Sequence, residues 1–185
     1  MKETDNQPSK ALIARGKAGE EAALVAIYQW YRPKIQRFLH YRLRHRQTAE
    51  DLTTEVFLRM LKHLPDYRLQ GGTFQGWLFQ IARNLVVDQF RRQSVRDHEP
   101  IDENLEADII PPEDVAHHQM LSLEIREAFQ ELTEGQLDVI SLRFIAELSI
   151  ADVAQALNKS ESAVKSLQAR GLRTLQLCLT REKVQ

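Results

Sequence analysis

Residues 149–170 constrain the fold more than any other part of this 185-residue chain. Ser149 is a good N-cap for the segment 150–157, whose apolar side chains recur at the spacing of one helix face. Asn158 follows where the chain has to leave a helix, and asparagine tolerates the left-handed conformation that such a stop often needs. Ser160 can then cap a second helix. The pattern predicts a helix-turn-helix, whose second helix is of the kind that enters a DNA major groove. A helical hairpin with no DNA role is the alternative.

Composition favours a helical protein without disulfides or metal. The chain has seven Gly and six Pro, and its single Cys can form neither an intrachain disulfide nor the CxxC pair of a structural zinc site. We therefore expect no cofactor and no metal. No apolar stretch approaches the length needed to span a bilayer, and the polar N-terminus does not resemble a secretion signal. We expect a soluble, cytoplasmic protein.

Charge is unevenly distributed along the chain, although the net charge is only −1. Residues 31–96 hold thirteen basic and five acidic side chains, a balance of +8, whereas residues 97–118 hold eight acidic side chains and no Lys or Arg. A basic block followed at once by an acidic one indicates a polyanion-binding surface tethered to a polyanion mimic. A solvated surface whose charges cancel by accident is the alternative.

The sequence predicts an all-α fold of two small helical domains. Domain 1–96 and domain 119–185 are separated by the proline-containing acidic segment 97–118, which has the composition of an extended linker. The helices expected in the first domain cover 12–43 with Pro33 as a kink or restart, 48–64 begun by Thr48 with Asp51, and a long helix capped by Thr73. The second domain adds helices over 120–132 and 133–146, the latter opened by a Thr133–Gln136 capping box, before the helix-turn-helix.

Four segments of this chain together resemble the RNA polymerase sigma factors of the sigma-70 type, specifically the small extracytoplasmic-function (ECF) group. The segments are AEDLTTEVFLR (49–59), TFQGWLFQIARNLVVDQFRR (73–92), LTEGQLDVISLRF (132–144) and the helix-turn-helix of 149–173. They occur in the order of the family and have its acidic connector between them. The resemblance implies a region 2 helical bundle and a region 4 helix-turn-helix that direct transcription initiation without catalysis.

The first segment is expected to bind core RNA polymerase. Its charged positions can face outward while its apolar positions face a core, a pattern that also suits an ordinary solvated helix. The resemblance implies that this helix docks on a basic coiled coil of the largest polymerase subunit. The candidate contacts are Asp51, Leu52, Glu55, Val56, Phe57 and Arg59.

The second segment and the loop before it are expected to read and melt the minus-ten promoter element. Asn84, Asp88 and Arg91 recur at spacings that place them on one polar helix face, where Asn can bond a base edge and Arg can hold a phosphate. A local structural role for Asn84 and Asp88 is the alternative. In the family the loop captures a base flipped from the non-template strand, and Tyr67 either stacks on such a base or packs on residue 74 or 77. Trp77 reads as a core residue. The candidate residues are Tyr67, Arg68, Asn84, Asp88, Arg91 and Arg92.

The helix-turn-helix is expected to read the minus-thirty-five element. The candidate residues are Ser160, Ser162, Lys165, Ser166 and Arg170. Many members of the family place an Arg after the Lys-Ser pair, whereas this chain has Leu167 and Gln168, so one familiar DNA-facing side chain is missing. The acidic linker is expected to thread a basic polymerase channel, or to act only as a flexible tether.

The implied partners are core RNA polymerase, promoter DNA and an anti-sigma factor of the kind that often restrains family members, with no membrane insertion. A free-standing helix-turn-helix regulator is the competing interpretation, although it leaves the basic first domain unexplained. A nucleic-acid enzyme is disfavoured because no glycine-rich phosphate loop and no catalytic carboxylate set is present in the sequence.

Overall fold

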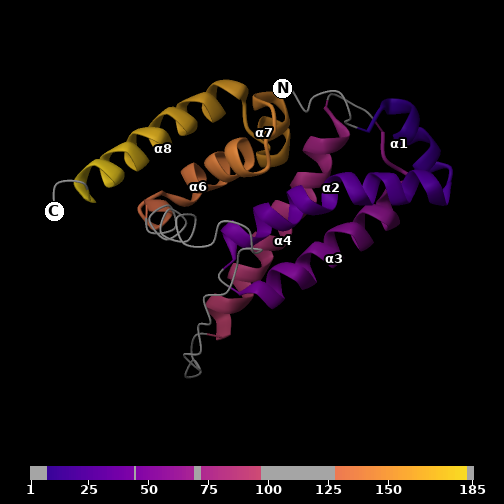
Figure 1. Ribbon diagram of the computed structural model, residues 1–185, viewed down its shortest axis with the longest axis horizontal. Coiled ribbons are helices and arrows are strands. Elements are labelled where there is room, and N and C mark those ends of the chain that lie inside the picture. The colour runs from indigo at the N-terminus through magenta and orange to yellow at the C-terminus, as the bar shows by residue number, and fades with distance from the viewer. Residues whose placement is uncertain (1–7, 44, 69–71, 97–127, 183–185) are drawn as a thin grey trace, which may run out of the picture.

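The computed structural model describes residues 8–43, 45–68, 72–96 and 128–182, and every regular element in these ranges is a helix (Figure 1). The predicted linker and most of the predicted helix over 120–132 lie outside the described residues. The predicted all-α class is confirmed. The domain limits of 1–96, 97–118 and 119–185 stay a prediction.

The first unit consists of α1 (Lys10–Lys17), α2 (Glu21–Arg42), α3 (Arg46–His63) and α4 (Phe74–Arg96). Helix α2 contacts each of the other three helices. Fully buried side chains from α2 and α4 form the centre of its core, where Phe38 meets Phe79 edge-on with 5.8 Å between ring centroids. Thr73 caps α4 as predicted, because its hydroxyl accepts a 3.0 Å hydrogen bond from the backbone N–H of Gly76.

Three features of the helices in the first unit differ from the sequence prediction. The predicted helix over 12–43 is divided into α1 and α2, because the chain leaves the helical conformation at Gly19, whose φ is 82°. Helix α2 runs without a restart through Pro33. Helix α3 begins at Arg46 after His45, so the predicted start at Thr48 is wrong by two residues. The two additional residues are supported by Arg46, which pairs with Glu50 at 2.9 Å.

The second unit consists of α6 (Glu134–Ile140), the π-helical turn η2 (Ser141–Ile145), α7 (Ile150–Leu157) and α8 (Glu161–Glu182). The predicted Thr133–Gln136 capping box is present, and Ser149 caps α7 by accepting from the N–H of Asp152 at 3.1 Å. Asn158 adopts the predicted left-handed conformation, with φ of 51°. Ser160 caps α8 by accepting from the N–H of Ala163 at 3.2 Å. The helix-turn-helix is therefore formed as expected.

The two units pack against each other. Helix α7 lies beside one end of α4, and η2 contacts α2 (Figure 1). One buried apolar cluster runs across both units, from Phe79 and Leu78 of α4 to Leu148 and Val153 of the second unit. The second unit therefore packs directly on the first, and we call this the closed arrangement. The sequence did not predict it.

Candidate nucleic-acid interface

The outward face of α3 combines charged and apolar side chains. Asp51 is exposed, and the half-buried Glu55 pairs with Arg59 at 2.7 Å. Leu58 and Leu61 are 56% and 45% exposed, and Leu58 shares its face with Asp51 and Glu55 by helical spacing. Sequence reasoning missed both leucines, although an apolar residue at an outward position was the available signal. Exposed apolar surface flanked by charges is typical of a protein contact.

Two of the predicted polymerase contacts are misplaced on this helix. Val56 is fully buried and Phe57 is 5% exposed, so neither side chain can reach a partner. Phe57 instead packs edge-on against Tyr28 of α2, with 4.7 Å between ring centroids. Leu52 is half-buried and packs against the core. The candidate polymerase-binding surface therefore consists of the outward-facing residues of α3.

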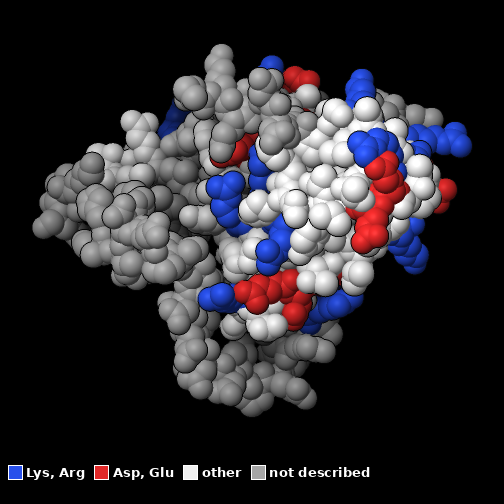
Figure 2. Space-filling model, turned by 45° about the vertical axis from the view of Figure 1, so that its right-hand side comes forward, with Lys and Arg blue, Asp and Glu red and all other residues white. Residues whose placement is uncertain are grey.

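Ion pairs neutralise part of the basic excess of residues 31–96. On the face shown in Figure 2, acidic side chains lie directly beside basic ones in small groups, and uncharged surface separates these groups. Arg46 and Arg59 each pair with a glutamate on their own helix, while Arg42 and Arg83 face Asp138 of the second unit. The cations that remain available for a polyanion are therefore more localised than the sequence count indicates.

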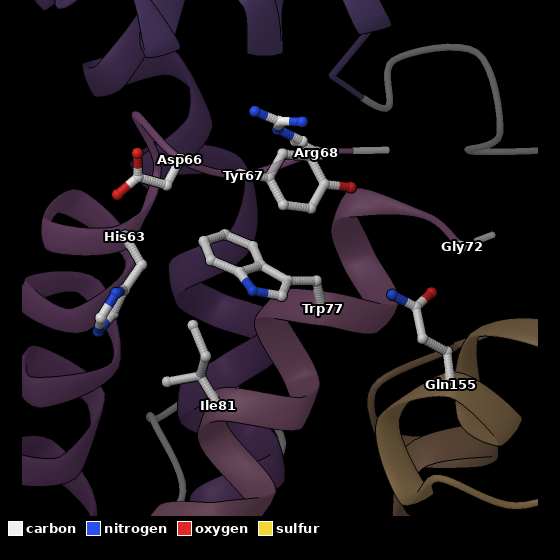
Figure 3. Close-up of a pocket in the computed structure, with 8 residues that line it drawn as sticks. All are labelled: His63, Asp66, Tyr67, Arg68, Gly72, Trp77, Ile81 and Gln155. Atoms are coloured by element: carbon white, nitrogen blue, oxygen red, sulfur yellow. The ribbon is translucent and has the colours of Figure 1, made fainter. Parts of the chain in front are cut away.

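A cavity of about 450 Å³ lies between the end of α3 and the start of α4. Figure 3 shows the side chains around it: His63, Asp66, Tyr67, Arg68, Gly72, Trp77, Ile81 and Gln155. The rings of Tyr67 and Trp77 lie 4.7 Å apart, and those of Tyr67 and Phe74 lie 5.5 Å apart. Tyr67 therefore packs on residues 74 and 77 and also lines the cavity, while its stacking on a base stays a prediction.

The cavity has the chemistry of a site for a single planar group. Its floor is aromatic and Arg68 supplies a cation at the edge, which suits an unstacked nucleobase. Burial raises the pKa of the Tyr67 hydroxyl above its ordinary value, so this group stays neutral. The loop is held to α1 by Lys17, whose ammonium donates to the Tyr67 carbonyl oxygen at 2.6 Å.

The predicted polar face of α4 continues directly from this cavity. Trp77 and Ile81 line the cavity, and Asn84 and Asp88 follow on the same side of the helix by spacings of three and four. Asn84 is exposed and Asp88 is half-exposed. Arg91 and Arg92 are exposed at the far end of the same helix. The structure thus joins all six predicted minus-ten residues into one cavity-and-stripe surface.

The five predicted residues of the second helix of the helix-turn-helix are all exposed. They are Ser160, Ser162, Lys165, Ser166 and Arg170, which lie at the N-cap and along the first half of α8. Lys165 approaches Glu161 at only 3.9 Å, so the pair is loose and the ammonium is open to solvent. Backbone N–H groups at such a helix start favour an anion such as a phosphate.

The two residues that depart from the family pattern serve the interior of the second unit. Leu167 is half-buried and packs against the core. Gln168 accepts a 3.1 Å hydrogen bond from the Nε of Arg143, which also donates to the Leu148 carbonyl oxygen. Arg143 thus ties η2 to α8 and to the start of α7. Sequence reasoning missed this arginine, as it missed Gln155 in the cavity.

Comparison with known proteins agrees with this geometry. The model of Sigma-70 region 2 matches residues 27–96, and that of Sigma-70 region 4 matches residues 128–177. The class defined by this pair of regions is the sigma-70 type of transcription-initiation protein.

Two curated relatives narrow the class. The ECF RNA polymerase sigma factor BldN of Streptomyces coelicolor is 36% identical over 175 residues, which cover 94% of this chain and 66% of BldN. The ECF RNA polymerase sigma factor SigX of Bacillus subtilis is 33% identical over 171 residues, which cover 84% of this chain and 82% of SigX. The chain belongs to the ECF group of the sigma-70 family.

Solved structures share the fold. CnrH, in complex with the cytosolic domain of CnrY, matches 95% of this chain and 99% of its own with a TM-score of 0.73 at 18% identity. RpoE of Bartonella quintana, in complex with the anti-sigma factor NepR, matches 83% of this chain and 94% of its own with a TM-score of 0.67 at 21% identity.

Sigma factors are regulatory rather than catalytic proteins. Among the described residues no helix is long and apolar enough to cross a membrane. The same part of the chain brings together no group of three or more His, Cys, Asp or Glu that could hold a metal ion.

Proposed function

We propose that this ECF sigma factor binds core RNA polymerase through α3 and directs initiation by reading two promoter elements. The cavity and the stripe of α4 receive the minus-ten element, with an unstacked base between Tyr67 and the rim formed by Arg68. The start of α8 reads the minus-thirty-five element. The observation that carries this proposal is the continuity of the aromatic cavity with the exposed polar face of α4.

Partners and setting follow from the same proposal. The protein acts in the cytoplasm, where it joins core polymerase on promoter DNA, and it performs no catalysis of its own. Domains 1–96 and 119–185 engage separate elements, and the acidic segment 97–118 connects them through the basic channel of the polymerase. Two solved structures with the same fold are complexes, of CnrH with the cytosolic domain of CnrY and of RpoE with the anti-sigma factor NepR, which supports an inhibitory protein partner for this chain as well.

Run-off transcription on genomic DNA with purified core polymerase tests the function. We expect products whose start sites share two upstream elements at fixed spacing, and no such products when this chain is left out. A free-standing regulator would instead bind its DNA sites equally well without polymerase, and that result would contradict the proposal.

Glu55→Arg tests the assignment of α3. The substitution reverses a charge on the outward face, so we expect it to weaken holoenzyme assembly at least tenfold, a loss typical of a charge facing its own sign across an interface. Assembly is measured by titrating labelled protein with core polymerase. Glu50→Arg is the matched control, because it breaks an equivalent ion pair on another side of the same helix. Equal binding by the wild type and Glu55→Arg would show that α3 is not the docking surface.

A further inference from the structure

A side chain of helix α7 in the second unit forms two hydrogen bonds with the backbone of Thr73, the residue that caps α4. The side-chain amide of Gln155 accepts from the backbone N–H of Thr73 at 2.7 Å and donates to the Thr73 carbonyl oxygen at 3.2 Å. Gln155 also lines the cavity, and in Figure 3 it enters from α7 on the opposite side of Trp77 from His63. A paired donor and acceptor of this kind is what the edge of a nucleobase presents.

A carboxylate completes the same contact. The Thr73 hydroxyl donates to Asp152 Oδ1, while the Ser149 hydroxyl donates to Asp152 Oδ2 at 2.6 Å. Asp152 is only 7% exposed, and it lies between the N-terminal ends of α4 and α7. The positive ends of two helix dipoles therefore face one anion, which belongs to the second unit.

A second anchor lies farther along α4. Asp138 of α6 lies 2.9 Å from Arg42 Nη2, and Arg83 Nε donates to its other oxygen at 3.4 Å. The side chains of Arg42 and Asp138 are 2% and 4% exposed. The second unit thus presents two carboxylates and an amide to the start of α4 and to two arginines of the first unit.

We propose that these two anchors form a latch that holds the free protein in a form unable to take single-stranded DNA. The latch consists of Thr73 with Asp152 and Gln155, and of Asp138 with Arg42 and Arg83. A base in the cavity belongs to a strand that has to leave the cavity on two sides. One side is the stripe of α4, and α7 lies across the other. The proposal rests on the proposed function only in taking the cavity as the site of the base.

Gln155→Ala tests the latch in the full chain. The variant loses both amide hydrogen bonds to Thr73, and alanine keeps α7 helical. We expect faster hydrogen exchange at the Thr73 backbone amide, because Gln155 is its acceptor. We also expect about tenfold tighter binding of a fluorescein-labelled single-stranded DNA pool of random sequence in the absence of polymerase, the order expected when two neutral hydrogen bonds stop favouring the closed form. Gln176→Ala makes the same change on an exposed face of α8 and should alter neither measurement.

Gly76→Ala reaches the latch from the other unit. A Cβ at position 76 would lie 2.3 Å from Gln155 Oε1 and 3.2 Å from the Asp152 carbonyl oxygen, so it displaces the amide. Alanine is a better helix former than glycine, so α4 is retained. We expect the same two changes as in Gln155→Ala.

Unchanged exchange at Thr73 in Gln155→Ala would overturn the latch, and so would faster exchange without tighter DNA binding. These outcomes are distinct from failure of the proposed function. If the latch fails alone, the wild-type chain still supports run-off transcription with core polymerase. If the function fails alone, no variant supports transcription, although Thr73 exchange still responds to loss of Gln155.

Discussion

Two non-glycine residues of the described chain hold a left-handed backbone, namely Asn158 with φ of 51° and Glu147 with φ of 59°. Asparagine adopts this conformation readily, whereas glutamate has no local compensation and bears a strain of about 1–2 kcal/mol. The contact of Glu147 with Lys34 is 3.8 Å long and the Glu147 side chain is 51% exposed, so the pair contributes little.

We therefore expect Glu147→Gly to raise the free energy of unfolding by about 0.5–1 kcal/mol, the strain relieved less the extra chain entropy of glycine. Urea denaturation measures the change. Asn158→Gly is the matched control and should change stability less, because asparagine already adopts this conformation readily. A loss of stability in Glu147→Gly would mean that the ion pair outweighs the strain.

Individual site residues were predictable where local periodicity determines exposure. The spacing of Asn84 and Asp88 on α4 placed them outward, and the structure agrees. Val56 and Phe57 were assigned to a partner through the resemblance alone, and both are buried. Gln155 gave no signal, because its partner Thr73 is far away in the sequence and belongs to the other unit.

Helix α2 carries a proline in its interior. Pro33 has no backbone N–H, so the carbonyl oxygen one turn earlier lacks its helical donor, yet α2 continues from Glu21 to Arg42. Pro33 is exposed, which leaves that carbonyl oxygen open to water, while buried residues on the other faces of α2 keep the helix in place.

We expect Pro33→Ala to stabilise the protein by about 1–3 kcal/mol, since alanine restores the hydrogen bond and has the better helix propensity. Thermal unfolding followed by circular dichroism measures it as a higher midpoint. Gln29→Ala, an exposed change on the same helix, serves as the reference and should shift the midpoint little. A lower midpoint for Pro33→Ala would indicate that Pro33 is needed for the packing of α2.

Helix starts with a side-chain cap were predicted well. The caps of Thr73, Thr133 and Ser149 each rest on a serine or threonine within three residues of its backbone donor, so a short window of sequence suffices. The start of α3 was misplaced because no side chain caps it, and an ion pair extends it instead. The π-helical turn η2 was not predicted, because its register depends on how this segment packs against α2.

For the whole molecule, the closed arrangement should depend on pH through Asp138. Burial raises the pKa of this carboxyl above its ordinary value of 3.8, and Glu134 raises it further, against Arg42 and Arg83, which lower it. The closed form therefore binds the Asp138 proton more tightly than an open form with the carboxyl in water. The resulting stabilisation is complete below the ordinary pKa and is lost as pH rises through the raised one.

We accordingly expect the radius of gyration in small-angle X-ray scattering to increase as pH rises through this window. Asp138→Asn removes the titrating group and should flatten the dependence while the helical content is kept. A molecule that becomes more compact with rising pH would contradict the assignment to Asp138.

The packing of the two units was beyond sequence analysis. The helices of each unit follow from periodicity and caps, but the contact between the two units depends on pairs such as Arg42 of α2 with Asp138 of α6 that no local pattern connects. The acidic composition of residues 97–118 predicts a tether between the units. The described contacts between the units instead use carboxylates of the second unit itself.

The sharing of Asp152 between two helix caps has a consequence for protein engineering. The carboxylate satisfies the start of α7 and the Thr73 hydroxyl together, so the two halves of the chain are matched at this point. A chimera that joins this α4 to a C-terminal half from another family member inherits the match only if that half carries an acid and an amide at the corresponding positions. Exchanging halves to change promoter choice therefore also changes the stability of the closed arrangement in the hybrid before it binds polymerase.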